Sequence, residues 1–220
     1  MMFQIQTDAS FREKGVCFGV LEAAFPQREA WDLPAFEALK FRELERLKET
    51  FAAYDRKAVF GENPYYRYFK KYKKTYPVLQ QLESFLLKGR PFPSGNPVNE
   101  IAFLAELRTQ ILLGAHDIDR IAGVPELFCP AEKLPYPGMR GEEVHTYPGD
   151  VSGRDRDGII WGMIAGADER TCIRPDSTHI AYLVFGAPGV MKEQVEDLLG
   201  ILSDYTRTLA PAAEIHKLLI

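Results

Sequence analysis

The side chains best suited to acid–base chemistry gather in one short segment, which runs from His116 to Arg120 and reads His-Asp-Ile-Asp-Arg. The His116 imidazole can exchange a proton near neutral pH, and Asp168 is a second candidate for proton transfer further along the chain. Asp117 and Asp119 could bind a cation, but two carboxylates without further ligands are weak grounds for a metal site. We favour the alternative that both accept hydrogen bonds from backbone N–H groups in a turn. The sequence therefore predicts neither a metal nor a cofactor.

A second segment, residues 65–74, combines aromatic and basic side chains. Clustered cations bind phosphates and exposed aromatic rings stack on unpaired bases, so this segment is the best local candidate for RNA contact. The alternative, which we favour, is an amphipathic helix whose aromatic side chains belong to the core and whose lysines face solvent. The net charge of −4 argues against a generally cationic nucleic-acid-binding surface. The candidate RNA-binding residues are Arg67, Lys70, Lys71, Lys73 and Lys74.

Residues 150–158 superficially resemble a calcium-binding loop. Their acidic spacing misses the EF-hand pattern and the closing glutamate is absent, so we predict a solvent-exposed hairpin instead. The sequence contains no glycine-rich phosphate loop, nucleophile elbow or paired-histidine metal motif. The remaining histidines are scattered along the chain (His145, His179 and His216).

The composition is that of a soluble globular protein, because 46% of the 220 residues are hydrophobic and 26% are charged. We recognise neither a signal peptide nor an apolar stretch long enough to span a membrane. The cysteines are odd in number and widely spaced, which argues against a disulfide framework and against a paired-thiol zinc site. We expect buried free thiols and a cytoplasmic location; the cysteines are Cys17, Cys129 and Cys172.

The elements that must position these side chains are mainly helices in the first half of the chain and strands in the second. Apolar residues at helical spacing predict helices over residues 33–51, 77–86, 98–112 and 191–202. Alternating patterns predict strands over residues 3–7, 16–21, 126–129, 143–147, 159–164, 171–173 and 179–185. Without regular βαβ alternation, this order predicts an α+β fold. We expect a single domain, 1–220, with a core at about 60–205 and an N-terminal strand–helix extension, 1–59, packed on it.

The stretch from Pro97 to Ile121 resembles a diagnostic segment of the tRNA-editing and tRNA-binding module in the β subunit of phenylalanyl-tRNA synthetase. In that family a proline, two residues and an acidic residue open a helix, as Pro97 and Glu100 would here. The helix ends in a turn reading His-Ala-Phe-Asp-Leu-Asp-Lys, which is similar to Gly114 through Arg120. The resemblance extends over residues 60–205 and implies a three-layer domain in which a β-sandwich of unusual topology is backed by helices.

The family hydrolyses tyrosine wrongly esterified to tRNA, which requires a positioned water and donors that stabilise an oxyanion. By resemblance, the threonine-asparagine pair of the family corresponds to Ala102 and Phe103, and its turn histidine corresponds to Gly114. Its glutamate falls on Leu183 or Val184. Apolar side chains cannot exchange protons, so the resemblance implies that the family's hydrolytic mechanism is not run here by the same groups.

His116 lies two positions after the site of the family's histidine. One interpretation is that it has taken over that role from the same pocket; the other, which we favour, is a partly buried histidine that fills an aromatic site. By the same resemblance, a ligand pocket would be lined by Glu100, Ala102, Phe103, Gly114, His116, Gly166 and Val184.

Three functions follow as hypotheses. The first is a tRNA- or aminoacyl-tRNA-binding protein with a degenerate hydrolytic site. The second is a non-catalytic protein that binds a small, amino-acid-like molecule, since apolar pockets with few polar anchors are ordinary ligand sites. The third is a hydrolase of mischarged aminoacyl-tRNA that uses His116 or Asp168. We recognise no aminoacylation domain, so we do not expect the chain to charge tRNA by itself.

Overall fold

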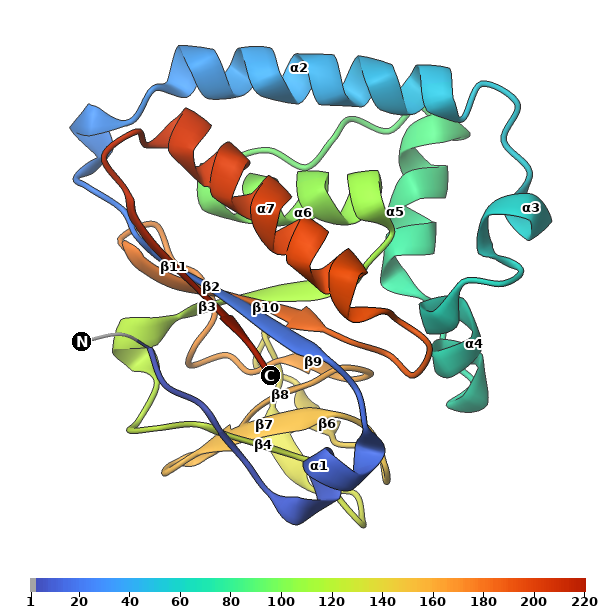
Figure 1. Cartoon of the computed structure of the whole chain (residues 1–220), viewed down its shortest axis with the longest axis vertical. Helices are drawn as coiled ribbons and strands as arrows, with labels where there is room; N and C mark the ends of the chain where they lie inside the picture. Colours follow the sequence, from blue (N-terminus) through green and yellow to red (C-terminus); the bar gives the residue numbers. More distant parts are fainter. Residues whose placement is uncertain (1–2) are drawn as a thin grey trace.

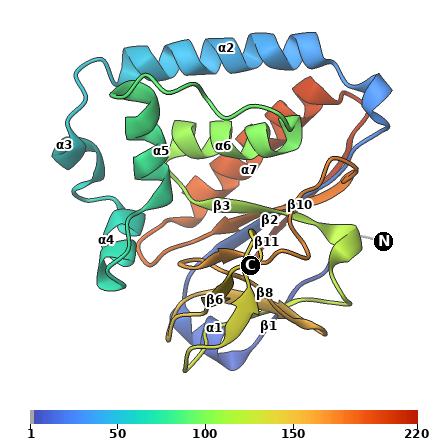
Figure 2. The ribbon, with the colours of Figure 1, turned by 180° about the vertical axis from the view of Figure 1, so that it is seen from behind.

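The computed structural model describes residues 3–220 and arranges them in three layers (Figure 1). A group of helices covers one face of a four-stranded sheet, and a second, five-stranded sheet lies against the other face. The view from behind shows that the long helices all stay on one side of the central sheet (Figure 2). The predicted α+β fold, a β-sandwich backed by helices, is confirmed.

The central layer is an antiparallel sheet with the strand order β11-β2-β10-β3. Its strands are β2 (Phe18–Ala24), β3 (Leu113–Asp117), β10 (His179–Phe185) and β11 (Glu214–Leu219). β2 pairs with β10 along its whole length and also pairs with β11. The first 59 residues therefore supply an interior strand of this sheet in addition to a helix that covers it.

Two helices lie directly on the central sheet, and a third crosses over both of them (Figure 1). Residue Gly19 of β2 allows the close approach, because a methyl group there would lie 2.6 Å from Val195 of the C-terminal helix. The Tyr182 hydroxyl of β10 donates a hydrogen bond to the Val98 carbonyl oxygen at 3.0 Å. The long helices are α2 (Leu33–Thr50), α5 (Pro77–Leu86), α6 (Pro97–Thr109) and α7 (Lys192–Leu209).

The second sheet has the order β1-β4-β7-β8-β9 and carries the predicted hairpin of residues 150–158. Its strands are β1 (Gln6–Thr7), β4 (Glu126–Phe128), β7 (Ser152–Asp155), β8 (Gly158–Gly162) and β9 (Gly166–Ala167). A separate hairpin joins β5 (Pro135–Pro137) to β6 (Glu143–His145). The short helices are α1 (Ala9–Lys14), α3 (Arg56–Phe60) and α4 (Pro64–Lys71), with 3₁₀ turns η1 (Arg28–Ala30) and η2 (Ile118–Arg120).

Trp161 of β8 joins the two sheets. Its indole stacks on Phe18 of β2 at 5.6 Å between ring centroids and packs against Phe185 of β10 at 4.9 Å. On the other side of the indole, Gly153 of β7 leaves room where any side chain would collide with the ring. This aromatic contact fixes the separation of the sheets.

The structure corrects the end of one expected helix and removes one expected strand. The helix expected over residues 98–112 ends at Thr109, because Gln110 takes a left-handed conformation with φ of 55°. The apolar residues that follow continue into β3, which the helical pattern concealed. Residues 171–173 form no strand: Cys172 makes only an isolated bridge to His116, because the Thr171 amide bonds to the side chain of Asp168.

Within residues 3–220, no helix combines the length and the apolar composition needed to cross a membrane.

The packing of Trp161 predicts the effect of two glycine substitutions. A methyl group at Gly153 would lie 2.3 Å from the indole, so Gly153→Ala should lower the free energy of unfolding by about 1–3 kcal/mol. Gly200 is the control, because a methyl group there meets no atom within 4 Å. Gly200→Ala in α7 should raise stability by about 0.5–1 kcal/mol. Urea denaturation measures both changes, and equal stabilities of the two variants would contradict this packing.

Candidate functional site

His116 belongs to a buried chain of polar side chains between β3 and the segment after β9. The Thr171 hydroxyl donates to Asp168 Oδ1, and His116 Nδ1 lies 2.8 Å from Thr171 Oγ1. Because the single hydroxyl proton is used toward Asp168, neutral His116 carries its proton on Nδ1. Its Nε2 is fully buried and has no hydrogen-bond partner among the described residues. Burial lowers the pKa of His116 to about 4, so the imidazole is neutral at physiological pH.

The space beside Gly114 is narrow. A methyl group at Gly114 would lie 3.4 Å from His116 Nε2 and 3.2 Å from the Phe185 ring. His116 itself is fully buried, so a substrate in solvent does not reach the imidazole in this structure. This is more burial than the partly buried histidine of the favoured interpretation.

The structure brings Gly114 and His116 together and leaves other predicted pocket residues elsewhere. Both face the second sheet, whereas Val184 pairs with Gly19 and so faces the helices. Gly166 belongs to β9 of the second sheet. Three more, Glu100, Ala102 and Phe103, lie on α6, on the helical side of the central sheet. Glu100 is used in packing the helices, since it forms an ion pair with Lys40 of α2 at 2.6 Å.

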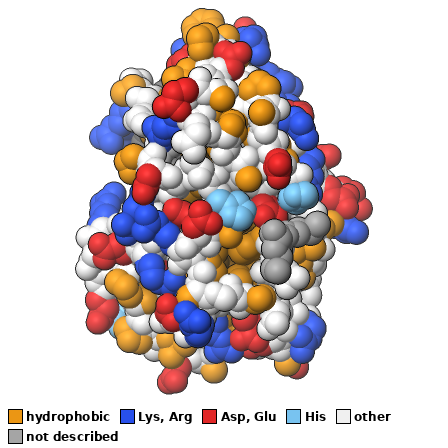
Figure 3. Space-filling model, turned by 90° about the vertical axis from the view of Figure 1, so that its left-hand side faces the viewer, with side chains coloured by type: hydrophobic (Ala, Val, Ile, Leu, Met, Phe, Trp, Pro, Cys, Tyr) orange, Lys and Arg blue, Asp and Glu red, His pale blue; other side chains and the backbone are white. Residues whose placement is uncertain are grey.

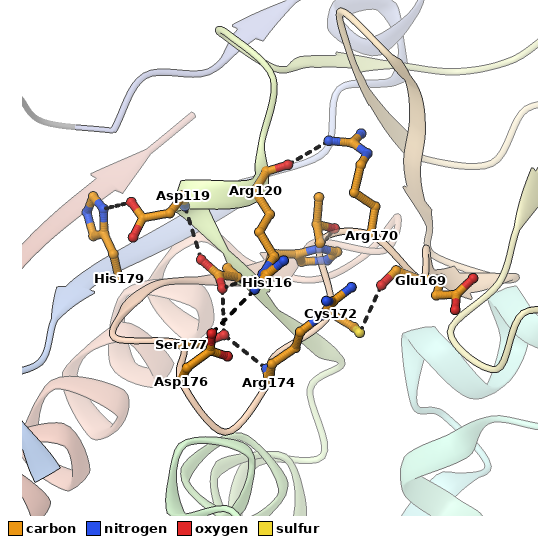
Figure 4. A network of polar contacts seen from close by, with 12 residues as sticks. His116, Asp119, Arg120, Glu169, Arg170, Cys172, Arg174, Asp176, Ser177 and His179 are labelled. Atoms are coloured by element: carbon orange, nitrogen blue, oxygen red, sulfur yellow. Dashed lines mark hydrogen bonds and ion pairs between the residues drawn. The ribbon is translucent and has the colours of Figure 1, made fainter.

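The two aspartates after His116 serve the local structure (Figure 4). Asp117 accepts hydrogen bonds from the Asp119 amide at 3.1 Å, from Arg120 Nε at 3.0 Å and from the Ser177 hydroxyl at 2.6 Å. This is the turn role that the sequence suggests. Asp119 instead lies 3.2 Å from His179 Nδ1.

His179 also contacts Glu22 of β2, at 2.9 Å from Nε2, so it bridges two carboxylates. Figure 3 shows histidine and acidic side chains next to each other on this side of the molecule, with basic and acidic groups intermixed around them. Among residues 3–220, no three His, Cys, Asp or Glu side chains come together in a way that could hold a metal ion.

The basic aromatic segment forms the amphipathic helix α4. Tyr65, Tyr68 and Phe69 are buried, so they are not available to stack on bases. Arg67 is exposed and forms an ion pair with Glu62. The remaining basic residues, Lys70, Lys71, Lys73 and Lys74, are all exposed to solvent.

The turn after α4 contains one strained residue, Lys73, and determines the position of Lys74. The Lys73 amide bonds to the Lys70 carbonyl and the Lys74 amide bonds to the Phe69 carbonyl, which is a Schellman motif. Lys73 occupies its left-handed position, with φ of 56°, where glycine is usual. This turn directs Lys74 across the Tyr147 ring, with Nζ 5.6 Å from the ring centroid.

Tyr147 lies in a hollow of about 430 Å³, which we call the Tyr147 pocket. Lys133 joins Lys74 there, with Nζ 5.9 Å from the Tyr147 centroid. Neither lysine forms an ion pair with a carboxylate of residues 3–220. The pocket is lined by Lys74, Lys133, Val144, Tyr147, Ile164 and Ala165, together with Glu143 and His145.

A buried carboxylate, Asp150, holds the walls of this pocket together. Asp150 accepts hydrogen bonds from the Tyr68 hydroxyl of α4 at 2.9 Å and from the Ile164 amide at 2.8 Å. Its own amide donates to the Tyr147 carbonyl at 2.9 Å. Burial raises the pKa of Asp150 to about 7, and the hydrogen bonds and Lys14 partly oppose this rise.

Sequence reasoning found the lysines of α4 and missed Lys133, Tyr147 and Asp150. Lys133 and Tyr147 are distant from Lys74 in sequence, and only the β5–β6 hairpin brings them beside it. Asp150 was interpreted as part of a solvent-exposed hairpin. Its position before the apolar Val151 gave no signal of its burial.

No family profile and no curated protein sequence matches this chain. Among solved structures, the chain is similar to an N-terminal fragment of the phenylalanyl-tRNA synthetase β subunit from Pyrococcus horikoshii, with a TM-score of 0.47 and 11% sequence identity. The superposition covers 100% of this chain and 56% of that fragment. This likeness assigns neither a family nor a function to the chain.

The polar chain of His116 predicts the effect of removing one hydroxyl group. Thr171→Val leaves His116 Nδ1 without a partner and Asp168 with one fewer, so it should lower the free energy of unfolding by about 1–3 kcal/mol. Thr171→Ser keeps the hydroxyl and should cost clearly less. Urea denaturation of the two variants tests this, and equal losses would show that the hydrogen bonds contribute little.

The buried Asp150 predicts a pH-dependent stability. Its pKa is about 7 in the folded protein and 3.8 in a model peptide, so the unfolded chain releases this proton first. The contribution is complete below about pH 4 and is lost as the pH rises to about 7, at up to about 1.4 kcal/mol per pH unit. Asp150→Asn lacks this loss. The stability of Asp150→Asn relative to wild type should therefore be higher at pH 7.5 than at pH 4.5, and a difference independent of pH would refute the assignment.

Proposed function

We propose that this chain is an RNA-binding protein whose partner is tRNA or aminoacyl-tRNA. We further propose that it is a cytoplasmic relative of the synthetase β-subunit editing module, without that module's hydrolytic groups. The observation that carries the proposal is the unpaired cationic surface formed by α4, its strained turn and the Tyr147 pocket. The sequence resemblance of residues 97–121 supplies the choice of tRNA.

The positive charge of the proposed binding surface is a local feature. The chain as a whole is acidic, with a net charge of −4, and several buried or half-buried acids are matched by basic partners. Examples are Arg170 with Asp155 at 2.9 Å and Arg154 with Glu126 at 2.6 Å. The lysines of α4 and the pocket have no such partners among the described residues. Unpaired ammonium groups beside a pocket favour phosphate binding through release of counterions.

Hydrolysis of an aminoacyl ester is less well supported. A general base must reach a water molecule or the substrate within hydrogen-bond distance. The free nitrogen of His116 is fully buried, and Asp168 accepts hydrogen bonds from the Thr171 amide and hydroxyl. Binding without catalysis is therefore the function that these contacts favour.

Lys70 and Lys71 provide the first test of the proposal. Lys70→Gln/Lys71→Gln removes two exposed charges without touching the core, so tRNA binding should weaken. The slope of log K against log salt should also fall by about 0.7–0.9 for each phosphate contact removed. Fluorescence anisotropy with labelled tRNA at several salt concentrations measures both quantities.

The matched control is Arg42→Gln/Arg46→Gln on the exposed side of α2, which removes the same charge from a different surface (Figure 1). It should leave the salt slope unchanged. Equal effects of the two double variants, or absence of tRNA binding by the wild-type protein at low salt, would overturn the proposal.

A further inference from the structure

We propose that the Tyr147 pocket is a mononucleotide-binding site that takes one nucleotide of the RNA, with its phosphate at Lys74 and Lys133 and its base against the apolar floor. This inference deepens the proposed function and rests on it for the identity of the larger ligand. It goes further in naming the unit that is recognised and the side chains that recognise it.

The size and lining of the pocket favour a nucleotide. A volume of about 430 Å³ lies within the range of about 300–1,000 Å³ that is typical of small-molecule sites. Val144, Ile164 and Ala165 form an apolar floor beside the Tyr147 ring. The flat face of a base can pack on such a floor, whereas a free phosphate ion has no apolar surface to bury there.

Two cations without carboxylate partners among the described residues border the pocket. Lys74 and Lys133 approach it from separate segments, and each Nζ lies within 6 Å of the same ring centroid, at 5.6 and 5.9 Å. Glu143 also lines the pocket, but its carboxylate lies 3.6 Å from His145 Nε2. A phosphate in the pocket that contacts either ammonium group would form a charge-assisted hydrogen bond, which no carboxylate of the described residues now supplies.

The walls of the pocket are held in place before any ligand arrives. Asp150 ties the Ile164 amide of the floor to Tyr68 of α4, the helix that leads into Lys74. The Tyr72 ring packs edge-on against Tyr147 at 5.6 Å and fixes the orientation of the phenol ring. A pocket of this kind loses little conformational entropy when a ligand binds.

The test uses adenosine 5′-monophosphate and the full-length protein, followed by NMR of backbone amides. We expect saturable shifts at Ile164 and Ala165 with a Kd below about 1 mM. Adenosine, which lacks the phosphate, and ribose 5-phosphate, which lacks the base, should each bind at least about 10-fold more weakly. Ribose 5-phosphate binding as tightly as the nucleotide would overturn the assignment of the floor to a base.

Lys74→Gln/Lys133→Gln should weaken binding of adenosine 5′-monophosphate by at least about 10-fold, as expected for lost charge-assisted contacts. Arg42→Gln/Arg46→Gln on α2 is the control of equal charge and should bind like wild type. No amide shift at 10 mM nucleotide (roughly 10 times the expected Kd), or equal affinity of Lys74→Gln/Lys133→Gln and wild type, would refute the inference.

The two proposals fail in distinguishable ways. If tRNA binds and Lys70→Gln/Lys71→Gln weakens it while adenosine 5′-monophosphate does not bind, the nucleotide site is refuted and the RNA-binding function stands. If the nucleotide binds at Ile164 and Ala165 while tRNA does not bind at any salt concentration, the RNA-binding function is refuted and the pocket remains a nucleotide site.

Discussion

The constraint on which the proposed site depends is the buried carboxylate of Asp150. A buried carboxylate is costly to ionise, and this cost appears as a pKa raised to about 7. The same carboxylate is the shared acceptor for Tyr68 and for the Ile164 amide. Without Asp150, the Tyr68 hydroxyl and the Ile164 amide would lose this hydrogen-bond acceptor. Leaving a buried donor unsatisfied costs about 1–3 kcal/mol for each group. Asp150 thus loses part of its own solvation, and its hydrogen bonds hold α4 in a fixed position relative to the second sheet.

The polar groups around His116 and those around Tyr147 differ in whether a ligand can reach them. Around His116 the polar contacts are buried, and Nε2, which carries the free lone pair, is buried without a partner among the described residues. Around Tyr147 the hydrogen bonds lie behind the pocket, while Lys74 and Lys133 remain exposed at its surface. A ligand can reach the groups around Tyr147 without rearrangement of the core. The proposed function therefore rests on the unpaired lysines and not on the acid–base residues.

Much of the fold could be predicted because its long elements have strong patterns. β10 has the bounds expected for it, and α7 begins where it is expected but continues to Leu209, beyond the expected end at residue 202. β3 was missed because Ile111 to Leu113 continues the apolar spacing of the preceding helix, and only the left-handed Gln110 ends it. The site was harder to predict for a different reason. The lysines of α4 are consecutive in sequence, whereas Tyr147 joins them only through tertiary packing that no local pattern records.

The turn at Lys73 combines backbone strain with an exposed positive charge. A left-handed residue other than glycine, asparagine or aspartate costs roughly 1 kcal/mol, and glycine at this position would remove that cost. A glycine would keep the Schellman motif and the path to Lys74 but would remove a cation. The chain instead has an exposed lysine at this position, next to Lys74, in a protein whose net charge is negative. Backbone strain at such a position is typical of functional surfaces. Under the proposed function, the lysine at this position adds a positive charge to the surface that would bind phosphate.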